Sequence, residues 1–303
     1  MTRVPQIGFL PDGRRLHLQD GPIDLIVEAR GDEAGMRAAY DAAARRFTGL
    51  LDELCSELPL LRQAADPERT LLKGTVARRM HAAVAPFAAA RFITPMAAVA
   101  GSVAEEILGA MTGAARLQRA YVNNGGDIAL HLAADERFAV GLMDRPDALG
   151  SMRTIAIDAG DPSRGVATSG RHGRSFSLGI ADAVTVLAAT ASQADAAATV
   201  IANAVDLPGH PAVLRCPAHD VQPDSDLGAR LVTRSVGELA GPEIALALEA
   251  GAACARRLLA MGLIDGVTLR LHGETCVVAA KAVGLAGLQA PIPAGATERL
   301  MHA

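Results

Sequence analysis

The clearest periodic pattern of apolar positions predicts an amphipathic helix between residues 33 and 58. Its larger apolar side chains recur at steps of seven, four, three and four residues, which aligns them on one face of an α-helix. They are Tyr40, Phe47, Leu51, Leu54 and Leu58. Because proline lacks the amide proton that continues a helix, Pro59 is expected to end it. Other Ala-rich helices are predicted at about 74–90, 96–112 and 193–205, and a longer one begins at Pro242.

Runs in which apolar and polar residues alternate predict strands. Two runs flank Asp20-Gly21 as a hairpin, and a second hairpin is predicted over 267–280. Further strands are predicted at about 119–123, 127–132, 137–142, 153–158 and 183–190. Strands and helices come in mixed clusters, not in the strict alternation that builds a doubly wound sheet. The pattern therefore predicts an α+β fold of mixed, mainly antiparallel sheets packed with Ala-rich helices.

The chain contains no linker-like segment and no internal repeat. We therefore expect one domain over residues 5–285. The stretches with candidate chemistry lie within about 15–205, the helix and hairpin of 206–285 complete the domain, and 286–303 form a tail.

The composition narrows the kinds of partner. Half of the residues are apolar, yet aromatic residues make up 3% and tryptophan is absent, so platforms for stacking nucleic-acid bases are not expected. The net charge of −4 arises from 33 acidic and 29 basic residues. No long run of either sign marks a surface for nucleic acid or membrane. We expect a small ligand, no nucleic acid and no membrane, and we leave a homodimer open.

The apolar runs and the cysteines favour a cytoplasmic protein. No apolar run reaches the 18 or so residues of a membrane span, and the N-terminal residues lack the apolar core of a signal peptide. Cysteines 55, 216, 254 and 276 are widely spaced, which argues against a zinc site or a redox dithiol. We expect buried free thiols.

The first stretch with candidate chemistry is "YVNNGGDIAL", residues 121–130. Asn-Gly between apolar runs is typical of a tight hairpin, because both residues tolerate positive φ angles. Gly125 and Gly126 would also let a ligand approach the backbone closely, and Asp127, just beyond the turn, could accept a hydrogen bond from a ligand hydroxyl. Hairpin and ligand loop both remain open.

The second stretch is "GVATSGRHGRS", residues 165–175, which follows an apolar strand. Hydroxyls, backbone amides and cationic side chains together suit a phosphate or another anion. These groups belong to Thr168, Ser169, Gly170, Arg171, His172 and Arg174. A polar surface loop is the equal alternative.

The third stretch is "SQADAAATV", in which Asp195 and Thr199 are four residues apart and so share a helix face. A carboxylate and a hydroxyl there could be two oxygen ligands of Mg²⁺. Ser192 and Asp195 also fit a variant capping box at the start of the same helix. Spacing alone favours the cap.

Together and in this order, "YVNNGGDI", "ATSG" and "VTVLAATASQADAAAT" resemble the ApbE superfamily, whose best-known members are FAD:protein FMN transferases. More closely, the chain resembles the small uncharacterised branch of that superfamily. The resemblance implies that Asn124, Gly125, Gly126 and Asp127 lie against a flavin nucleotide, FAD or FMN. It implies that Asp195 and Thr199 hold Mg²⁺ beside the pyrophosphate.

The chain departs from the transferases at two places. Their A-K-G-Y segment is replaced by Ala100-Gly101-Ser102, and "SFSLGIAD" lacks the histidine that the family carries after T-S-G. The expected function is therefore binding of a flavin nucleotide or related diphosphate with Mg²⁺, with FAD pyrophosphate cleavage or FMN transfer as the reactions that the family implies. The alternatives are a non-flavin enzyme acting on a small anion, in sulfur or C1 metabolism, and a catalytically inactive binding protein.

Overall fold

The computed structural model describes residues 4–142, 153–280 and 301–302. Its helices are α1 (Glu33–Phe47), α2 (Leu50–Ser56), α3 (Leu58–Leu61), α4 (Thr75–Ala88), the 3₁₀ turn η1 (Pro95–Ala98), α5 (Val99–Ala114), α6 (Ala191–Ala204), α7 (Ala218–Val221) and α8 (Gly241–Ala260). Its strands are β1 (Gln6–Phe9), β2 (Leu16–Asp20), β3 (Ile23–Arg30), β4 (Arg119–Asn124), β5 (Asp127–Leu132), β6 (Arg137–Leu142), β7 (Arg153–Asp158), β8 (Gly165–Ser169), β9 (Ala183–Ala188), β10 (Val213–Pro217), β11 (Leu231–Val236), β12 (Gly266–Leu271), β13 (Glu274–Ala279) and β14 (Met301–His302).

The centre of the fold is a nine-stranded sheet in the order β1-β2-β3-β4-β5-β8-β9-β12-β13, with every neighbouring pair antiparallel. A second sheet, β14-β6-β7, contains the parallel pair β14–β6, and β10–β11 form a two-stranded ribbon. The predicted α+β class with mainly antiparallel sheets is confirmed. The C-terminal hairpin β12–β13 joins the same sheet as the N-terminal strands, through the pair β9–β12.

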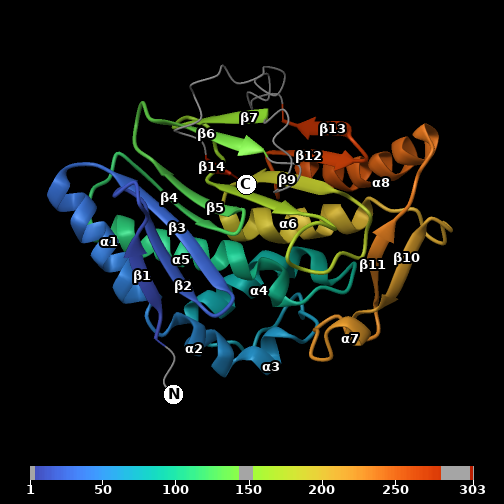
Figure 1. The fold of residues 1–303 in the computed structure, drawn as a ribbon, viewed down its shortest axis with the longest axis horizontal. Helices are drawn as coiled ribbons and strands as arrows, with labels where there is room; N and C mark the ends of the chain where they lie inside the picture. The colour runs from blue at the N-terminus through green and yellow to red at the C-terminus, as the bar shows by residue number, and fades with distance from the viewer. Residues whose placement is uncertain (1–3, 143–152, 281–300, 303) are drawn as a thin grey trace.

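The layers are held together by three apolar clusters. Helices α1, α2, α4 and α5 pack on the strands from β2 to β5, while α6 and α8 pack on the β8, β9 and β12 part of the same sheet (Figure 1). The third cluster joins the other face of the large sheet to β6 and β7, with side chains such as Ile128, Phe138 and Ile157. Alternation explains this arrangement, because successive residues of β3 are alternately buried and partly exposed.

The predicted helix of residues 33–58 is wrong as a single helix. It breaks at Gly49, whose φ of 83° lies in the left-handed region that ends many helices. Pro59 does not end a helix but occupies the first turn of α3, where a missing amide proton costs nothing. The apolar stripe survives because the break lets α2 bury Leu51 and Leu54 in the same cluster as Phe47.

The predicted strand bounds are confirmed for three strands, but the predicted burial of the cysteines is mostly wrong. The strands at 127–132, 137–142 and 153–158 have the predicted bounds. Only Cys254 is buried, whereas Cys55 is exposed on the outer side of α2, so the expectation of buried thiols is wrong for most of the cysteines. Of the predicted tail 286–303, only β14 lies within the described residues. No described helix has both the length and the apolar character to cross a bilayer.

Candidate functional site

The Asn-Gly stretch is a tight turn between β4 and β5. Gly125 and Gly126 have φ angles of 65° and 112°, and the Gly126 amide donates to Asn123 Oδ1 over 2.8 Å. Asn124 is buried at 7% exposure and donates to the Ala100 carbonyl, 3.2 Å away at the start of α5. The hairpin interpretation is therefore correct, and the same turn is tied to the first turn of a helix.

Asp127 begins β5 on the far side of that turn, directly opposite Asn124. Its Oδ1 accepts a hydrogen bond from the Thr168 amide, at 3.2 Å, so the first and second predicted stretches meet here. The Thr168 hydroxyl is 2.8 Å from that of Thr185 on β9. Pairing of β5 with β8, and of β8 with β9, brings these residues together.

Helices α5 and α6 cross at Gly101. A β-carbon on this residue would lie 2.3 Å from the Ala191 carbonyl oxygen, so only glycine allows the two backbones to come this close. The close crossing brings the Asp195 carboxylate to the first turn of α5, where its Oδ2 accepts from the Gly101 amide at 3.0 Å. In return, Glu105 on α5 accepts from the Ser192 amide of α6 at 2.6 Å.

The structure therefore corrects the capping-box interpretation of Ser192 and Asp195. Thr190 is the N-cap of α6, with its side chain accepting from the Gln193 amide. Asp195 instead satisfies amide protons of a different helix, α5. The sequence gave no signal that Glu105 of α5 caps the start of α6, because its partner, the Ser192 amide, is 87 residues away.

Asp127 and Asp195 both lie beside the first turn of α5, because Asp127 is paired with Asn124, which bonds Ala100, and Asp195 accepts from Gly101. Loss of water around Asp127, followed by the negative charge of Asp195, raises the pKa of Asp127 well above its usual range, against the opposing effects of the Thr168 amide and Arg174. Loss of water likewise raises the pKa of Asp195 to about 7, although the Gly101 and Ala100 amides favour its ionised form. A pair of like charges that both resist ionisation is an attractive place for a cation.

Thr199 lies one turn beyond Asp195 on α6 and is partly exposed, while the alanines between them are buried. The described residues contain no group of three or more His, Cys, Asp or Glu side chains arranged for a metal. A cation at the acid pair would therefore need further ligands from hydroxyls, carbonyls or a bound molecule.

The loop of residues 168–174 divides its cationic groups between two places. Arg171 is paired with Asp182 through 2.6 and 2.9 Å contacts, and His172 Nε2 is 3.3 Å from the same carboxylate. The other oxygen of Asp182 accepts from the His272 amide at 2.6 Å. No motif or spacing in the sequence indicated that Asp182 would be the ion-pair partner of Arg171.

Arg174 faces the turn instead. Its guanidinium carbon lies 3.4 Å from where a β-carbon on Gly125 would stand, and its charge lowers the pKa of Asp127. Ser169 pairs with Val184 at the end of β8, and Gly170 packs against the Asp182 backbone. Of the predicted anion-binding groups, Arg174 lies by the acid pair and Arg171 is held by Asp182.

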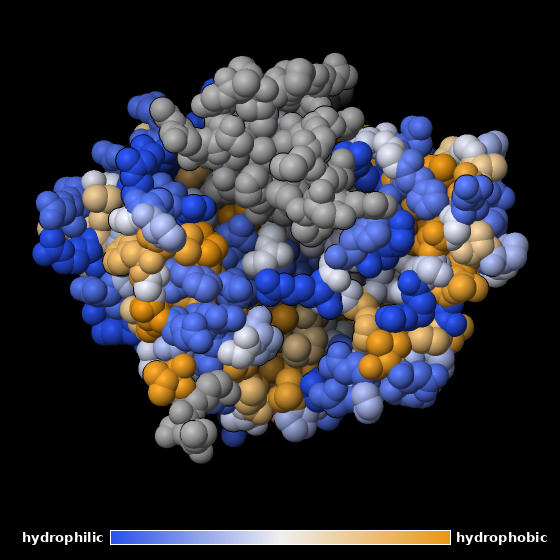
Figure 2. Space-filling view, viewed as in Figure 1, coloured by the Kyte–Doolittle hydropathy of each residue, from blue (hydrophilic) through white to orange (hydrophobic). Residues whose placement is uncertain are grey.

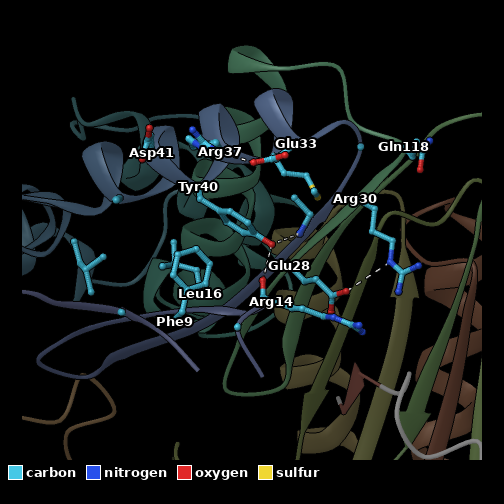
Figure 3. A pocket seen from close by; sticks show the side chains of 17 residues that line it. Phe9, Arg14, Leu16, Glu28, Arg30, Glu33, Arg37, Tyr40, Asp41 and Gln118 are labelled. Carbon is cyan, nitrogen blue, oxygen red and sulfur yellow. Dashed lines mark hydrogen bonds and ion pairs between the residues drawn. The ribbon is translucent and has the colours of Figure 1, made fainter. Parts of the chain in front are cut away.

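A cavity of about 900 Å³ lies elsewhere, between β1, the end of β3 and α1 (Figure 3). It contains none of the residues of the three sequence stretches. The convergence of carboxylates, glycines and Arg174 identifies the candidate site better than cavity size does, because ligand chemistry needs convergent polar groups.

Comparison with known proteins shows which family this chain resembles. A family model described as AbpE bacteria matches residues 7–277. A UPF0280 protein of Methanopyrus kandleri is 38% identical over 182 residues, which is 59% of this chain and 69% of that protein. Another, from Methanocella arvoryzae, is 36% identical over 184 residues, 60% of this chain and 71% of that protein. For the UPF0280 protein of Methanothermobacter thermautotrophicus, the match is 41% identical but covers 44% of its length.

Two solved structures that align with this chain at low identity are flavin transferases. ApbE of Vibrio cholerae matches with a TM-score of 0.44 and 13% identity, over 93% of this chain and 98% of that one. The apo form of Pseudomonas stutzeri flavinyl transferase ApbE matches with a TM-score of 0.44 and 11% identity, over 96% and 98%.

Proposed function

This chain belongs to the AbpE bacteria family, as its three ordered motifs predicted, and from that membership we propose that it binds a flavin nucleotide or a related diphosphate together with Mg²⁺. The ligand would lie over the Gly125-Gly126 turn, with its phosphates toward Arg174 and the carboxylates of Asp127 and Asp195. A flavin-related role agrees with the family. Our proposal adds the metal ion, the nucleotide and the residues that bind them.

The observation that carries the proposal is the convergence of Asp127 and Asp195. Backbone amides hold both carboxylates in place, since Asp127 Oδ1 accepts from the Thr168 amide and Asp195 Oδ2 accepts from the Gly101 amide. Mg²⁺ is commonly held by one or two carboxylates, completed by water and substrate phosphates. The Thr199 hydroxyl, on the same helix face, is a suitable further oxygen. The donor set therefore fits Mg²⁺ bound jointly with a phosphorylated ligand.

The groups around the acid pair would each contribute to ligand binding. The glycine turn lets the ligand approach the backbone, and Arg174 offers a charge-assisted hydrogen bond to a phosphate oxygen. When bound, Mg²⁺ would neutralise the diphosphate and stabilise a leaving phosphate. The hydrogen bonds from Asn124 to Ala100 and from Gly101 to Asp195 hold the turn and the acid in fixed positions relative to α5.

The chain lacks two of the features that the resemblance connects with group transfer. Ala100-Gly101-Ser102 lacks the lysine and the aromatic residue of the family's A-K-G-Y segment, and His172 contacts Asp182 instead of the acid pair. General acid–base help is worth about 10²–10⁴-fold in rate. The proposal therefore assigns binding to this chain and makes turnover an outcome of the experiment.

The test is calorimetric titration of the protein with FAD, FMN, ADP and pyrophosphate, each with and without Mg²⁺. The expected result is Mg²⁺-dependent binding of FAD that Asp195→Asn abolishes and Arg174→Ala weakens. Chromatography of the mixture then shows whether FMN and AMP form. Binding of pyrophosphate and ADP but not FMN would favour a non-flavin anion site, and no binding of any diphosphate would refute the proposal.

A further inference from the structure

A side chain from α1 opens the hairpin of β2 and β3 at its far end. Regular pairing stops at Leu16 and Val27, and continued pairing would bring Arg14 opposite Ala29. Opposite residues of this kind normally exchange backbone hydrogen bonds. Here the Tyr40 hydroxyl stands between them: it accepts from the Ala29 amide at 3.0 Å and donates to the Arg14 carbonyl at 2.7 Å (Figure 3). Tyr40 therefore replaces a direct backbone hydrogen bond and holds the two strands apart.

The second backbone hydrogen bond of this pair is redirected as well. In a regular ladder the Arg14 amide would donate to the Ala29 carbonyl. Instead it donates to Asp12 Oδ1 at 2.9 Å. Ala29 lines the cavity of about 900 Å³ that lies between these strands and α1. With its regular donor turned away, the Ala29 carbonyl is an acceptor for a molecule that enters the cavity.

The cavity has an aromatic wall. The rings of Phe9 and Tyr40 are nearly perpendicular, at 89°, with their centroids 5.3 Å apart. Phe9 packs on Tyr40 and is still 55% exposed, and Leu16 and Met36 line the same space. Figure 2 shows hydrophobic surface on the side of the molecule where β1 lies, at the left of the view. Two perpendicular rings form a corner in which a third ring stacks on one and meets the edge of the other.

The charges around the cavity are interspersed and balanced. Along α1, Arg37 stands four residues from Glu33 and four from Asp41, and it is ion-paired with Glu33 at 2.8 Å (Figure 3). On the strand side, Glu28 lies 3.8 Å from Arg30. The lining contains three acidic and three basic residues. Charges of both signs at close spacing largely cancel, so a charged ligand gains no net attraction over a neutral one.

We propose that this cavity binds an uncharged aromatic molecule that carries an amide or lactam N–H, at a site separate from the acid pair. The ring lies in the corner formed by Phe9 and Tyr40, and the N–H donates to the Ala29 carbonyl. The volume of about 900 Å³ is in the range of small-molecule sites. Because the Tyr40 hydroxyl holds the strands apart without a ligand, the site is formed in advance and binding orders little of the chain.

Saturation-transfer NMR with benzamide tests the class of ligand, in buffer without Mg²⁺ or nucleotide. Benzamide should bind. N,N-dimethylbenzamide keeps the ring and the carbonyl but has no N–H, so it should bind about tenfold more weakly or worse, since it leaves the Ala29 carbonyl unpaired. Benzoate and benzylammonium should also bind more weakly than benzamide. Absence of benzamide binding, equal binding of the dimethyl compound, or preference for either ion would refute the proposal.

Three variants test the position of the site. Phe9→Ala should weaken benzamide binding about tenfold, because the ring contact is lost. Leu231→Ala is the matched control, since Leu231 has the same 55% exposure on β11 and lies outside the cavity. Ala44→Phe, which fills the cavity from α1, should abolish binding. Circular dichroism and the melting temperature show that each variant is folded. Equal binding by wild type, Phe9→Ala and Ala44→Phe would place benzamide elsewhere and refute the proposal.

Tyr40→Phe tests whether the opening is built into the fold. It keeps the aromatic wall but removes the hydroxyl, so Arg14 and Ala29 can bond directly and the cavity narrows. Benzamide should then bind more weakly to Tyr40→Phe than to wild type, and unchanged affinity would overturn the role of the hydroxyl. These tests use neither Mg²⁺ nor a phosphorylated ligand. Their outcome is therefore independent of the function proposed for the acid pair.

Discussion

The carboxylate of Asp195, on α6, accepts a hydrogen bond from the amide of Gly101 at the first turn of α5, over 3.0 Å. Glu105, one turn further along α5, accepts from the Ser192 amide at the first turn of α6. Each helix therefore supplies the acid that caps the other. The two acids differ in their other neighbours: Asp195 lies by the Asp127 carboxylate, whereas Glu105 is ion-paired with Arg79 at 3.1 Å. The pair of helices thus provides both a candidate metal ligand and a control for it.

Asp195→Asn and Glu105→Gln should separate capping from ligand binding. Loss of either cap should lower the free energy of unfolding of the ligand-free protein by about 0.5–2 kcal/mol. Only Asp195→Asn should also lose the gain from Mg²⁺ and FAD, which is about 2.7 kcal/mol at a hundredfold excess over the dissociation constant. Thr199→Val should lose that gain with little change without ligand. Urea unfolding with and without both ligands is the measurement, and a gain retained by Asp195→Asn would exclude it as a metal ligand.

The stability of the ligand-free protein should fall as the pH rises through about 7. Burial raises the pKa of Asp195 from 3.8 to about 7, so the folded protein keeps a proton that the unfolded chain releases. The stability from this proton is fully present below about pH 4 and is lost as the pH rises through about 7; the raised pKa of Asp127 acts in the same direction.

Melting temperatures measured from about pH 5.5 to about pH 8 test this, at about 2–4 °C per kcal/mol for a protein of 150–250 residues and somewhat less for a longer chain. Wild type should melt lower at the alkaline end, and Asp195→Asn should show a smaller fall, because only Asp127 of the pair still titrates. Mg²⁺ with nucleotide should reduce the fall, since a cation can replace the proton. Equal slopes for wild type and Asp195→Asn would assign the pH dependence to other groups.

Arg174 and Arg171 should differ although they are three residues apart. Arg174→Ala should weaken diphosphate binding about tenfold or more, because a charge-assisted hydrogen bond is worth about 1.5–3 kcal/mol, and should leave stability nearly unchanged. Arg171→Ala should instead destabilise the protein by about 1–3 kcal/mol, since Asp182 loses its charged partner. Calorimetry and urea unfolding of both variants decide, and the reverse pattern would place the anion at Arg171.

Gly101→Ala should be strongly destabilising. Its β-carbon would meet the Ala191 carbonyl at 2.3 Å, and forcing the two helices apart should cost about 1–3 kcal/mol or more. Gly109→Ala, on the same helix with no atom within 4 Å of its added β-carbon, should stabilise by about 0.5–1 kcal/mol. Urea midpoints of the two variants make the comparison, and a neutral Gly101→Ala would mean that the helix crossing can relax.

Limited proteolysis should yield no pair of stable halves. The hairpin β12–β13 pairs with β9, and α8 packs on α6, so the residues after 206 complete the sheet and helix layer built by earlier ones. Cleavage in the loop between α6 and β10 should therefore lead to loss of both fragments. A stable N-terminal fragment ending near residue 205 would show that the chain has two domains.

The sequence by itself determined the local elements and the order of the motifs. The strands at 127–132, 137–142 and 153–158 follow from alternation, and the turn at Gly125-Gly126 follows from residues that tolerate positive φ. These features depend on neighbours in the chain, so nearby residues suffice to predict them. The helix break at Gly49 was missed because the apolar stripe continues across it.

Only the tertiary structure decided which candidate groups meet. Arg171 is ion-paired with Asp182, whereas Arg174 lies beside Asp127. Glu105 and Asp195 each accept a hydrogen bond from the first turn of the other's helix, from residues 87 and 94 positions away in the chain. No spacing encodes these contacts, because they depend on how the strands pair and on how closely α5 and α6 cross at Gly101. The edge position of β1 is likewise a property of the strand order. Periodicity within a segment can predict a face, but only the packing of all segments determines what that face meets.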